Sequence, residues 1–243
     1  MFYIFDVDMT LAESDCLMTD EMADVFRKAM KNEVYFFCSG SALPKMKEQI
    51  PADILEGAAG LLPVMGGELW RENELVYRRN FEWPKGLRED LEEVLKSSEY
   101  PERTGDHLQD RKTMVCFSTV GKAADMPARK RYEAWEEKYR EREIFAKKLS
   151  EKYPSLHFSI GGKTSVDISE HGNDKSQALF AMRKYYGDDA VMFFGDRLYE
   201  GGNDYPLSKA LEKEEGVKNI SIAVKNPEET LLKLKELAIK VAS

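Results

Sequence analysis

Short apolar runs, each followed within two residues by a polar side chain, occur near both ends of this chain. Phe2–Phe5, Val34–Cys38 and Ala190–Phe194 are three such runs. Continuous apolar runs of this length are typical of strands buried on both faces of a parallel sheet. They therefore predict a doubly wound α/β fold, in which ligands bind beyond the carboxyl ends of the strands.

Segments with apolar residues three and four positions apart alternate with these runs. This spacing places the apolar side chains on one face of a helix, and Thr19 offers a hydroxyl that can cap the first of them. The helices predicted in this way are Thr19–Lys31, Pro44–Gln49, Lys175–Tyr186 and Pro227–Val241, with a further strand at Ile220–Val224 and a hairpin at Glu68–Tyr77.

The middle of the chain has a different pattern. Leu87–Lys96 and Arg129–Lys152 read as charged amphipathic helices, and strand candidates lie at Thr113–Val120, Leu156–Ile160 and Ser165–Ile168. Helices combined with antiparallel strands inside a βαβ framework predict an inserted α+β domain. We expect a discontinuous core of residues 1–79 and 173–243, and a cap of residues 80–172.

Composition limits the classes of partner and the compartment. The 243 residues carry 36 Lys and Arg against 44 Asp and Glu, a net charge of −8, whereas a general nucleic-acid binder would be basic. No apolar stretch is long enough to span a membrane. The three cysteines form no CxxC pair, which favours free thiols in a reducing cytosol. We expect a cytoplasmic protein that binds neither nucleic acid nor membrane.

Asp6 and Asp8 follow the first apolar run directly. Side chains two residues apart on an extended chain point the same way, so both carboxylates would face the crevice beyond the sheet. One can act as a nucleophile and the other as a general acid and base. A polar strand end followed by a turn would give the same pair, so these two residues alone do not establish an active site.

Three other strand or helix ends offer matching groups. Asp196 follows the last apolar run, and its carboxylate together with those of Asp6 and Asp8 would form an acidic cluster suited to Mg²⁺. Ser39 can donate a hydrogen bond to a phosphoryl oxygen, and Lys175 can place a positive charge beside it. This combination favours a phosphate-handling site.

These residues resemble the four motifs of the haloacid-dehalogenase (HAD) superfamily of phosphoaspartate-forming phosphatases and phosphomutases. Within it, the chain resembles the eukaryotic-type α-phosphomannomutase family over nearly its whole length. The segments that carry this second resemblance are Ser159-Ile160-Gly161-Gly162, Ser165, Asp167, Gly172-Asn173-Asp174-Lys175, Phe193–Asp196 and Gly201–Asp204.

The resemblance implies a Rossmann-like core with an inserted cap of the C2 type. It implies that Asp6 is the nucleophile that becomes an aspartyl-phosphate and that Asp8 is the acid and base. It also implies that Mg²⁺ binds to Asp6, to the main-chain carbonyl of Asp8 and to Asp196, while Asp204 helps through water or by holding Lys175.

The resemblance also assigns roles in the cap. Ser165 and Asp167 match the family's binders of sugar hydroxyls, and Arg111, Lys122 and Arg129 match cap arginines that would hold the distal phosphate of the substrate. A solvated basic face is the alternative for any one of the three. The aromatic row of Tyr132, Trp135 and Tyr139 indicates packing or a dimer contact, since the family associates through its caps.

Three departures from the family pattern stand out. Met9 replaces a motif glycine after Asp8, Asp15 replaces an arginine near the place where a phosphosugar should bind, and the segment after Asp204 lacks an acidic residue of a second cation site. Asp15 would repel a substrate phosphate.

Two enzymatic functions and one binding function remain open on the sequence. The first is a mutase that moves phosphate between C1 and C6 of a hexose, with a hexose 1,6-bisphosphate as activator. The second is a Mg²⁺-dependent phosphatase acting on a sugar phosphate or another small phosphate ester. The third is a catalytically silent binding protein that keeps the fold.

Overall fold

The computed structural model describes residues 1–14, 16–161 and 163–241, so the expectations for Asp15 and Gly162 lie outside the described residues. The chain divides into two compact units. The core unit comprises Met1–Arg78 and Gly172–Ser243, and the cap unit comprises Arg79–His171. Each boundary lies one residue before the one expected from the sequence.

The core unit contains a seven-stranded sheet in the order β11-β10-β1-β2-β3-β4-β5. The first five strands in this order pair in parallel, and the last two pair antiparallel. This confirms the doubly wound α/β class. The strands are β1 (Phe2–Phe5), β2 (Val34–Cys38), β3 (Gly60–Leu62), β4 (Glu68–Arg71), β5 (Glu74–Arg78), β10 (Val191–Gly195) and β11 (Ile220–Ala223).

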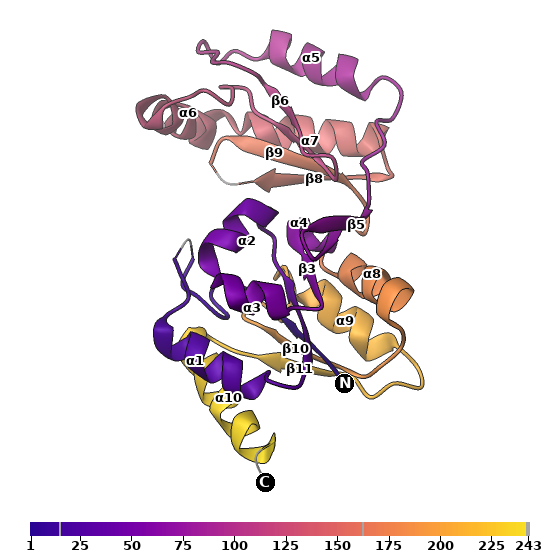
Figure 1. Ribbon diagram of the computed structural model, residues 1–243. Coiled ribbons are helices and arrows are strands. Elements are labelled where there is room, and N and C mark those ends of the chain that lie inside the picture. Colours follow the sequence, from indigo (N-terminus) through magenta and orange to yellow (C-terminus); the bar gives the residue numbers. More distant parts are fainter. Residues whose placement is uncertain (15, 162, 242–243) are drawn as a thin grey trace. The chain divides into compact units, whose positions relative to one another are not determined.

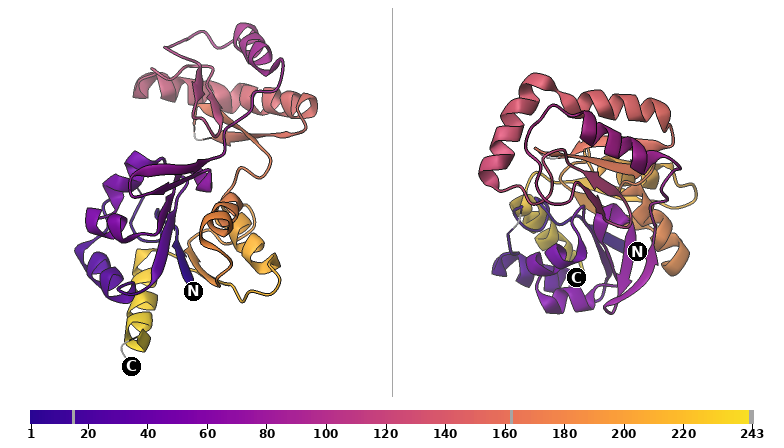
Figure 2. Two further views of the ribbon diagram at one scale, coloured as in Figure 1. Left: turned by 45° about the vertical axis from the view of Figure 1, so that its right-hand side comes forward. Right: turned by 90° about the horizontal axis from the view of Figure 1, so that it is seen from above.

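Helices cover both faces of the core sheet (Figures 1 and 2). α1 (Asp20–Ala29) and α10 (Pro227–Val241) pack on one face, and α8 (Ser176–Tyr186) and α9 (Tyr205–Lys213) pack on the other. The strands between them therefore carry apolar side chains on both faces: Phe5 packs on the α1 and α10 side, and Ile4 packs on the α8 and α9 side. Both are fully buried, and the ring centroids of Phe5 and Phe194 are 4.9 Å apart. Three short helices complete the unit: α2 (Leu43–Gln49), α3 (Ala52–Gly57) and α4 (Pro63–Gly66).

The cap unit contains a four-stranded antiparallel sheet in the order β6-β7-β9-β8. One face of this sheet packs against α5 and α7 through an apolar cluster that includes Leu91, Phe117, Phe145 and Ile168. The elements of the cap are α5 (Leu87–Ser97), β6 (Leu108–Asp110), β7 (Val115–Phe117), α6 (Met126–Tyr139), α7 (Glu141–Lys152), β8 (Leu156–Gly161) and β9 (Ser165–Glu170).

The prediction of one continuous helix over Arg129–Lys152 is wrong. The helix breaks at Arg140, which adopts the left-handed conformation with φ of 49°, and the chain continues as α7. The break lets the two helices pack in different places, because Tyr132 on α6 packs against Tyr100 in a separate cluster while Phe145 on α7 packs on the sheet.

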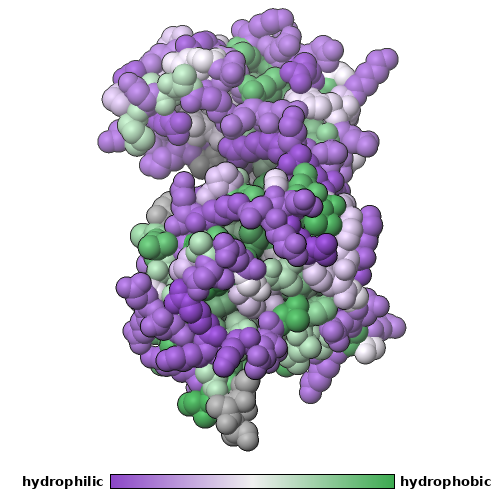
Figure 3. Space-filling model, in the orientation of Figure 1, coloured by the Kyte–Doolittle hydropathy of each residue, from purple (hydrophilic) through white to green (hydrophobic). Residues whose placement is uncertain are grey.

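The face of the molecule drawn in Figure 3 is mainly hydrophilic. Within the part of the chain that the structure describes, no helix combines the length and apolar character needed to cross a membrane.

Candidate active site

The carboxylate of Asp6 lies at the carboxyl end of β1, between the ends of two neighbouring strands. The main-chain N–H of Asp6 donates a hydrogen bond to the Phe194 carbonyl at 2.9 Å, so the chain beyond β1 stays attached to β10. Asp6 is only 2% exposed. Burial raises the pKa of the Asp6 carboxyl, and the Lys175 ammonium opposes this increase by stabilising the charged form.

Lys175 connects two buried carboxylates. Its side chain is completely buried just before α8, and its ammonium donates hydrogen bonds to Asp6 Oδ1 and, at 2.5 Å, to Asp204 Oδ1. A buried ammonium is stable only when it is paired and hydrogen-bonded. The two carboxylates raise the pKa of Lys175 against the opposing effect of its burial, so this side chain remains charged.

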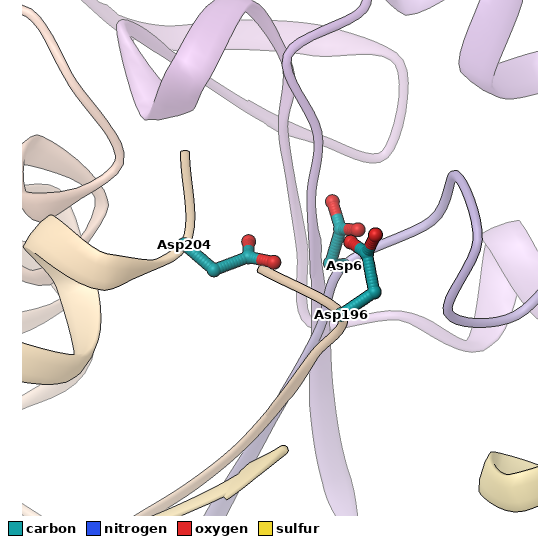
Figure 4. Close-up of side chains that lie close together, drawn as sticks. All are labelled: Asp6, Asp196 and Asp204. Atoms are coloured by element: carbon teal, nitrogen blue, oxygen red, sulfur yellow. The ribbon is translucent and has the colours of Figure 1, made fainter. Parts of the chain in front are cut away.

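Three carboxylates at this edge of the sheet form one acidic group. Two of them, Asp6 and Asp196, were expected there from the sequence. One oxygen each from Asp6, Asp196 and Asp204 lies within 4.8 Å of the other two, and Figure 4 shows the three side chains converging. Burial and the nearby charge of Asp204 raise the pKa of the Asp196 carboxyl. Such a set of oxygen donors can hold a hard divalent cation.

Asp204, like Asp6, has a hydrogen-bond donor at each carboxylate oxygen. Its second oxygen, Oδ2, accepts a hydrogen bond from the Arg197 main-chain N–H at 3.0 Å, so both oxygens already have donors. A side chain at Gly195 would bring its Cβ within 2.6 Å of Asp204 Oδ2, which explains the glycine at the end of β10, directly before Asp196.

The loop after β1 folds tightly around Asp6. The Met9 main-chain N–H donates to the Ala12 carbonyl at 2.7 Å, and Thr10 Oγ1 donates to Asp6 Oδ2 at 3.1 Å. Met9 has a φ of 60°. Methionine therefore adopts the conformation that glycine would adopt more easily, at a cost of about 1–2 kcal/mol.

The side chain of Asp8 lies outside the acidic group and has its own partners. Gln49 Nε2 donates to Asp8 Oδ1 at 3.0 Å, Ser41 Oγ donates to Oδ2 at 3.3 Å, and Lys45 Nζ lies 3.8 Å from Oδ1. This carboxylate is partly exposed, with 27% of its side-chain surface accessible. The expectation that the Asp8 carboxylate joins those of Asp6 and Asp196 in one cluster is therefore wrong, because its own partners hold it elsewhere. A metal contact through the main-chain carbonyl of Asp8, which the resemblance implies, stays a prediction.

Ser39 is fully buried directly after β2, at the same edge of the sheet as Asp6. Its Oγ accepts a hydrogen bond from the Ser41 main-chain N–H at 3.0 Å, and its own N–H donates to the Leu62 carbonyl. The hydroxyl hydrogen of Ser39 can therefore serve a ligand oxygen.

The structure also shows site residues that the sequence analysis missed. Gln49, Ser41 and Thr10 contact the two catalytic candidates directly. Thr10 could have been noticed from its place in the loop that also carries Asp6 and Asp8. Gln49 lies in a charged helical segment, 41 residues from Asp8, and only the pairing of β1 with β2 brings these segments together.

In the cap, Ser165 and Asp167 lie two residues apart on β9 and therefore share one face of the sheet. Cys116 on β7 is paired with Asp167, and Lys122 Nζ lies 2.7 Å from Cys116 Sγ, so Lys122 reaches this polar face. Asp167 Oδ1 is buried and has no hydrogen-bond partner among the described residues.

The two arginines expected to bind phosphate lie on different elements of the cap. Arg111 is exposed in the turn after β6, with Nε donating to Gln109 Oε1 at 3.2 Å. Arg129 is exposed on α6, and its Nε donates to the Ala124 carbonyl at 2.9 Å. Both guanidinium groups keep further N–H donors that a ligand can use.

Comparison with known proteins gives consistent results over the length of the chain. The sequence model for the eukaryotic phosphomannomutase family matches residues 22–240. A phosphomannomutase of Encephalitozoon cuniculi is 30% identical over 247 residues, which cover 98% of this chain and 94% of that protein. A phosphomannomutase of Saccharomyces cerevisiae is 28% identical over 243 residues, with 96% and 93% coverage.

Solved structures support the fold at lower identity. A haloacid dehalogenase-like hydrolase from Bacteroides thetaiotaomicron has a TM-score of 0.64 at 13% identity, covering 97% of this chain and 98% of that chain. The trehalose-6-phosphate phosphatase of Aspergillus fumigatus has a TM-score of 0.59 at 14% identity, with 98% and 92% coverage. These similarities show a HAD-like fold with an inserted cap.

Proposed function

Because this chain belongs to the eukaryotic phosphomannomutase family, we propose that it is a Mg²⁺-dependent hexose-phosphate mutase that interconverts mannose 1-phosphate and mannose 6-phosphate. The observation that carries this proposal is the buried Asp6 at the end of β1, bound to the Lys175 ammonium and within reach of Asp196. It joins a nucleophile, a fixed positive charge and a cation site in one place.

The donor set at this edge fits Mg²⁺. All donors are oxygen atoms, which is the chemistry that this cation prefers, and we assign Asp6, Asp196 and the main-chain carbonyl of Asp8 to it. Asp204 accepts a hydrogen bond from the Lys175 ammonium, and we assign it to holding Lys175 or to contacting the cation through water. When bound, the cation neutralises charge that develops on the transferred phosphoryl group.

The chain's own residues supply the remaining steps. A carboxylate oxygen of Asp6 attacks phosphorus, the bond to the sugar oxygen breaks, and an aspartyl-phosphate forms. Asp8 gives a proton to the departing sugar oxygen, and it later takes a proton from the hydroxyl that attacks the phosphoenzyme. Lys175 and the hydroxyl of Ser39 stabilise the phosphoryl oxygens by charge and hydrogen bonding.

We assign the second phosphate of the substrate to the cap. A mutase must hold a hexose 1,6-bisphosphate in two orientations, so its distal binding residues must accept either phosphate. Arg111, Lys122 and Arg129 would provide the positive charge, and Ser165 and Asp167 would bind sugar hydroxyls. The buried Asp167 Oδ1, which lacks a hydrogen-bond partner among the described residues, can accept from such a hydroxyl.

One assay tests this function against its alternatives. The protein is supplied with mannose 1-phosphate, Mg²⁺ and a catalytic amount of hexose 1,6-bisphosphate, and mannose 6-phosphate and inorganic phosphate are both measured. Mannose 6-phosphate without inorganic phosphate supports the mutase. Inorganic phosphate alone would replace it with a phosphatase that shares the Asp6 and Asp8 chemistry, and no turnover on a panel of phosphate esters would indicate a binding protein.

We also propose that two copies associate through their caps. On the aromatic row of α6, Tyr132 is buried, but Tyr139 is 42% exposed and lies beside Ile144, which is 65% exposed. Light scattering on the purified protein tests this, and a mass equal to that of one chain at micromolar concentration would reject it.

A further inference from the structure

The cap contains a close contact between a thiol and an amine. Cys116 is 1% exposed in β7 and lies on the polar face of the sheet, because its neighbours Val115 and Phe117 belong to the apolar cluster on the other face. Lys122 Nζ is 2.7 Å from Cys116 Sγ. This pair is separate from the acidic group of the core unit.

The distance is short for a hydrogen bond to sulfur. N–H···O hydrogen bonds cluster near about 2.9–3.0 Å, and sulfur is larger than oxygen, so an N–H···S hydrogen bond is normally longer than that. A sulfur atom and a nitrogen atom that are both bonded to one oxygen atom lie about this far apart. The two side chains are therefore placed for a covalent link with little movement of the backbone.

We propose that Cys116 and Lys122 form a reversible S–O–N cross-link when a peroxide oxidises the protein. One hydrogen peroxide converts the thiol to a sulfenic acid and is reduced to water. The unprotonated amine then bonds to the sulfenic oxygen, and a second peroxide takes one hydrogen from each group and leaves as two waters. Two molecules of a dithiol restore the free thiol and amine by supplying two hydrogen atoms each, with the bridging oxygen released as water and both dithiols oxidised to disulfides.

The cross-link has a consequence for substrate binding, which rests on the proposed function. Lys122 is one of three cationic side chains assigned to the distal phosphate, and a nitrogen bonded to oxygen is too weak a base to keep its positive charge at neutral pH. Lys122 is also withdrawn toward Cys116, next to Asp167. Oxidation would therefore weaken binding of the phosphate ester, and reduction would restore it.

Mass spectrometry tests the cross-link without reference to activity. The purified protein is treated with hydrogen peroxide, digested, and searched for a peptide pair joining Cys116 to Lys122 that has gained one oxygen atom and lost two hydrogen atoms. We expect this product in the unmodified chain and in Cys16→Ser, which removes an exposed thiol, and its disappearance after dithiothreitol. Cys116→Ser and Lys122→Arg should lack it.

Other products overturn the proposal. Sulfenic or sulfinic acid at Cys116 with an unmodified Lys122 would show that the amine does not participate. A joined pair without the added oxygen would indicate a direct S–N bond and would reject the oxygen bridge. Either result leaves the proposed mutase function untouched, because it concerns only the chemistry of this pair.

Kinetics test the regulatory role. We expect peroxide to raise KM for the phosphate ester about tenfold or more in the unmodified chain, the effect of losing one charged hydrogen bond, and dithiothreitol to reverse the change. Cys116→Ser and Lys122→Arg should show no such response to peroxide. A cross-link that forms with KM unchanged would overturn the regulatory role and would also remove Lys122 from the phosphate site.

Discussion

The core sheet is covered by helices on both faces, whereas the cap sheet carries its apolar cluster on one face only. In the core, the candidate catalytic side chains Asp6, Ser39 and Asp196 lie directly beyond the strand ends. In the cap, alternate residues of the strands themselves are polar, as in Cys116 and Asp167.

This difference determines how each unit can tolerate change. The core side chains are buried and bonded to one another, so the loss of one leaves a partner uncompensated. The cap side chains proposed for binding each contribute separately to one ligand. We therefore expect core substitutions to abolish chemistry and cap substitutions to change affinity.

The largest effect is expected for Asp6→Asn. An amide oxygen is a poor nucleophile, so no aspartyl-phosphate forms and kcat should fall by about 10⁴-fold or more. Turnover of mannose 1-phosphate measures this, with Asp53→Asn as the control, since Asp53 is an exposed core residue whose carboxylate pairs with Arg27. Wild-type turnover by Asp6→Asn would rule out the aspartyl-phosphate mechanism.

The second largest effect is expected from a comparison of a buried ion pair in the core with a buried ion pair in the cap. Lys175→Met leaves two buried carboxylates without their cation and should lower the free energy of unfolding by about 3–5 kcal/mol, as well as remove activity. Glu136→Gln breaks the Arg142–Glu136 pair, whose side chains are 11% and 8% exposed. It should destabilise the cap while retaining kcat.

Urea unfolding and steady-state kinetics measure both variants. Equal losses of kcat in Lys175→Met and Glu136→Gln would contradict the division of roles, because a stability loss in the cap would then be sufficient to stop the chemistry.

Gln49→Leu should have an intermediate effect. Gln49 is 2% exposed and donates to Asp8 Oδ1, so its loss frees the acid and base to rotate, and kcat should fall about 10–100-fold with little change in KM. Lys47→Leu is the matched control, since Lys47 lies on the same helix but bonds Asn73. A rise in KM at unchanged kcat would show that Gln49 binds substrate instead.

The fold of the core could be predicted from sequence because its strands are apolar on both faces. Val34–Cys38 and Pro227–Val241 appear in the structure with the predicted bounds. The break at Arg140 had no local signal, because no glycine or proline marks the end of a helix there. The α9 helix was missed although Leu207 and Leu211 have helical spacing and a proline lies in its first turn.

The candidate site could be predicted where residues directly follow strands, and at Lys175, which directly precedes α8. Asp6 and Asp196 were expected beside one another because parallel strands end at one edge of a sheet. The partners of Asp8 could not be inferred, since Gln49 enters the site from a helix that follows a different strand. The contact of Lys122 with Cys116 likewise depends on the path of the loop after β7.

The smallest expected effect concerns a partly buried ion pair of the core. Arg183 donates to both oxygens of Glu214 at 2.8 and 2.7 Å, and together with Asn219 it lowers the pKa of that carboxyl. A carboxyl whose pKa is lower in the folded state stabilises the fold at neutral pH, and this contribution is lost as the pH falls through its folded-state pKa. Glu214→Gln should therefore lower the free energy of unfolding by about 1–2 kcal/mol at about pH 7, and by progressively less below about pH 4.

Asp90→Asn in the cap should lower the free energy of unfolding by less at neutral pH, because its partner Lys152 is 59% exposed and solvent screens the pair. Urea unfolding followed by the fluorescence of Trp70 in the core and of Trp83 and Trp135 in the cap separates the two effects, and a loss for Glu214→Gln that does not change with pH would show that packing rather than charge is responsible.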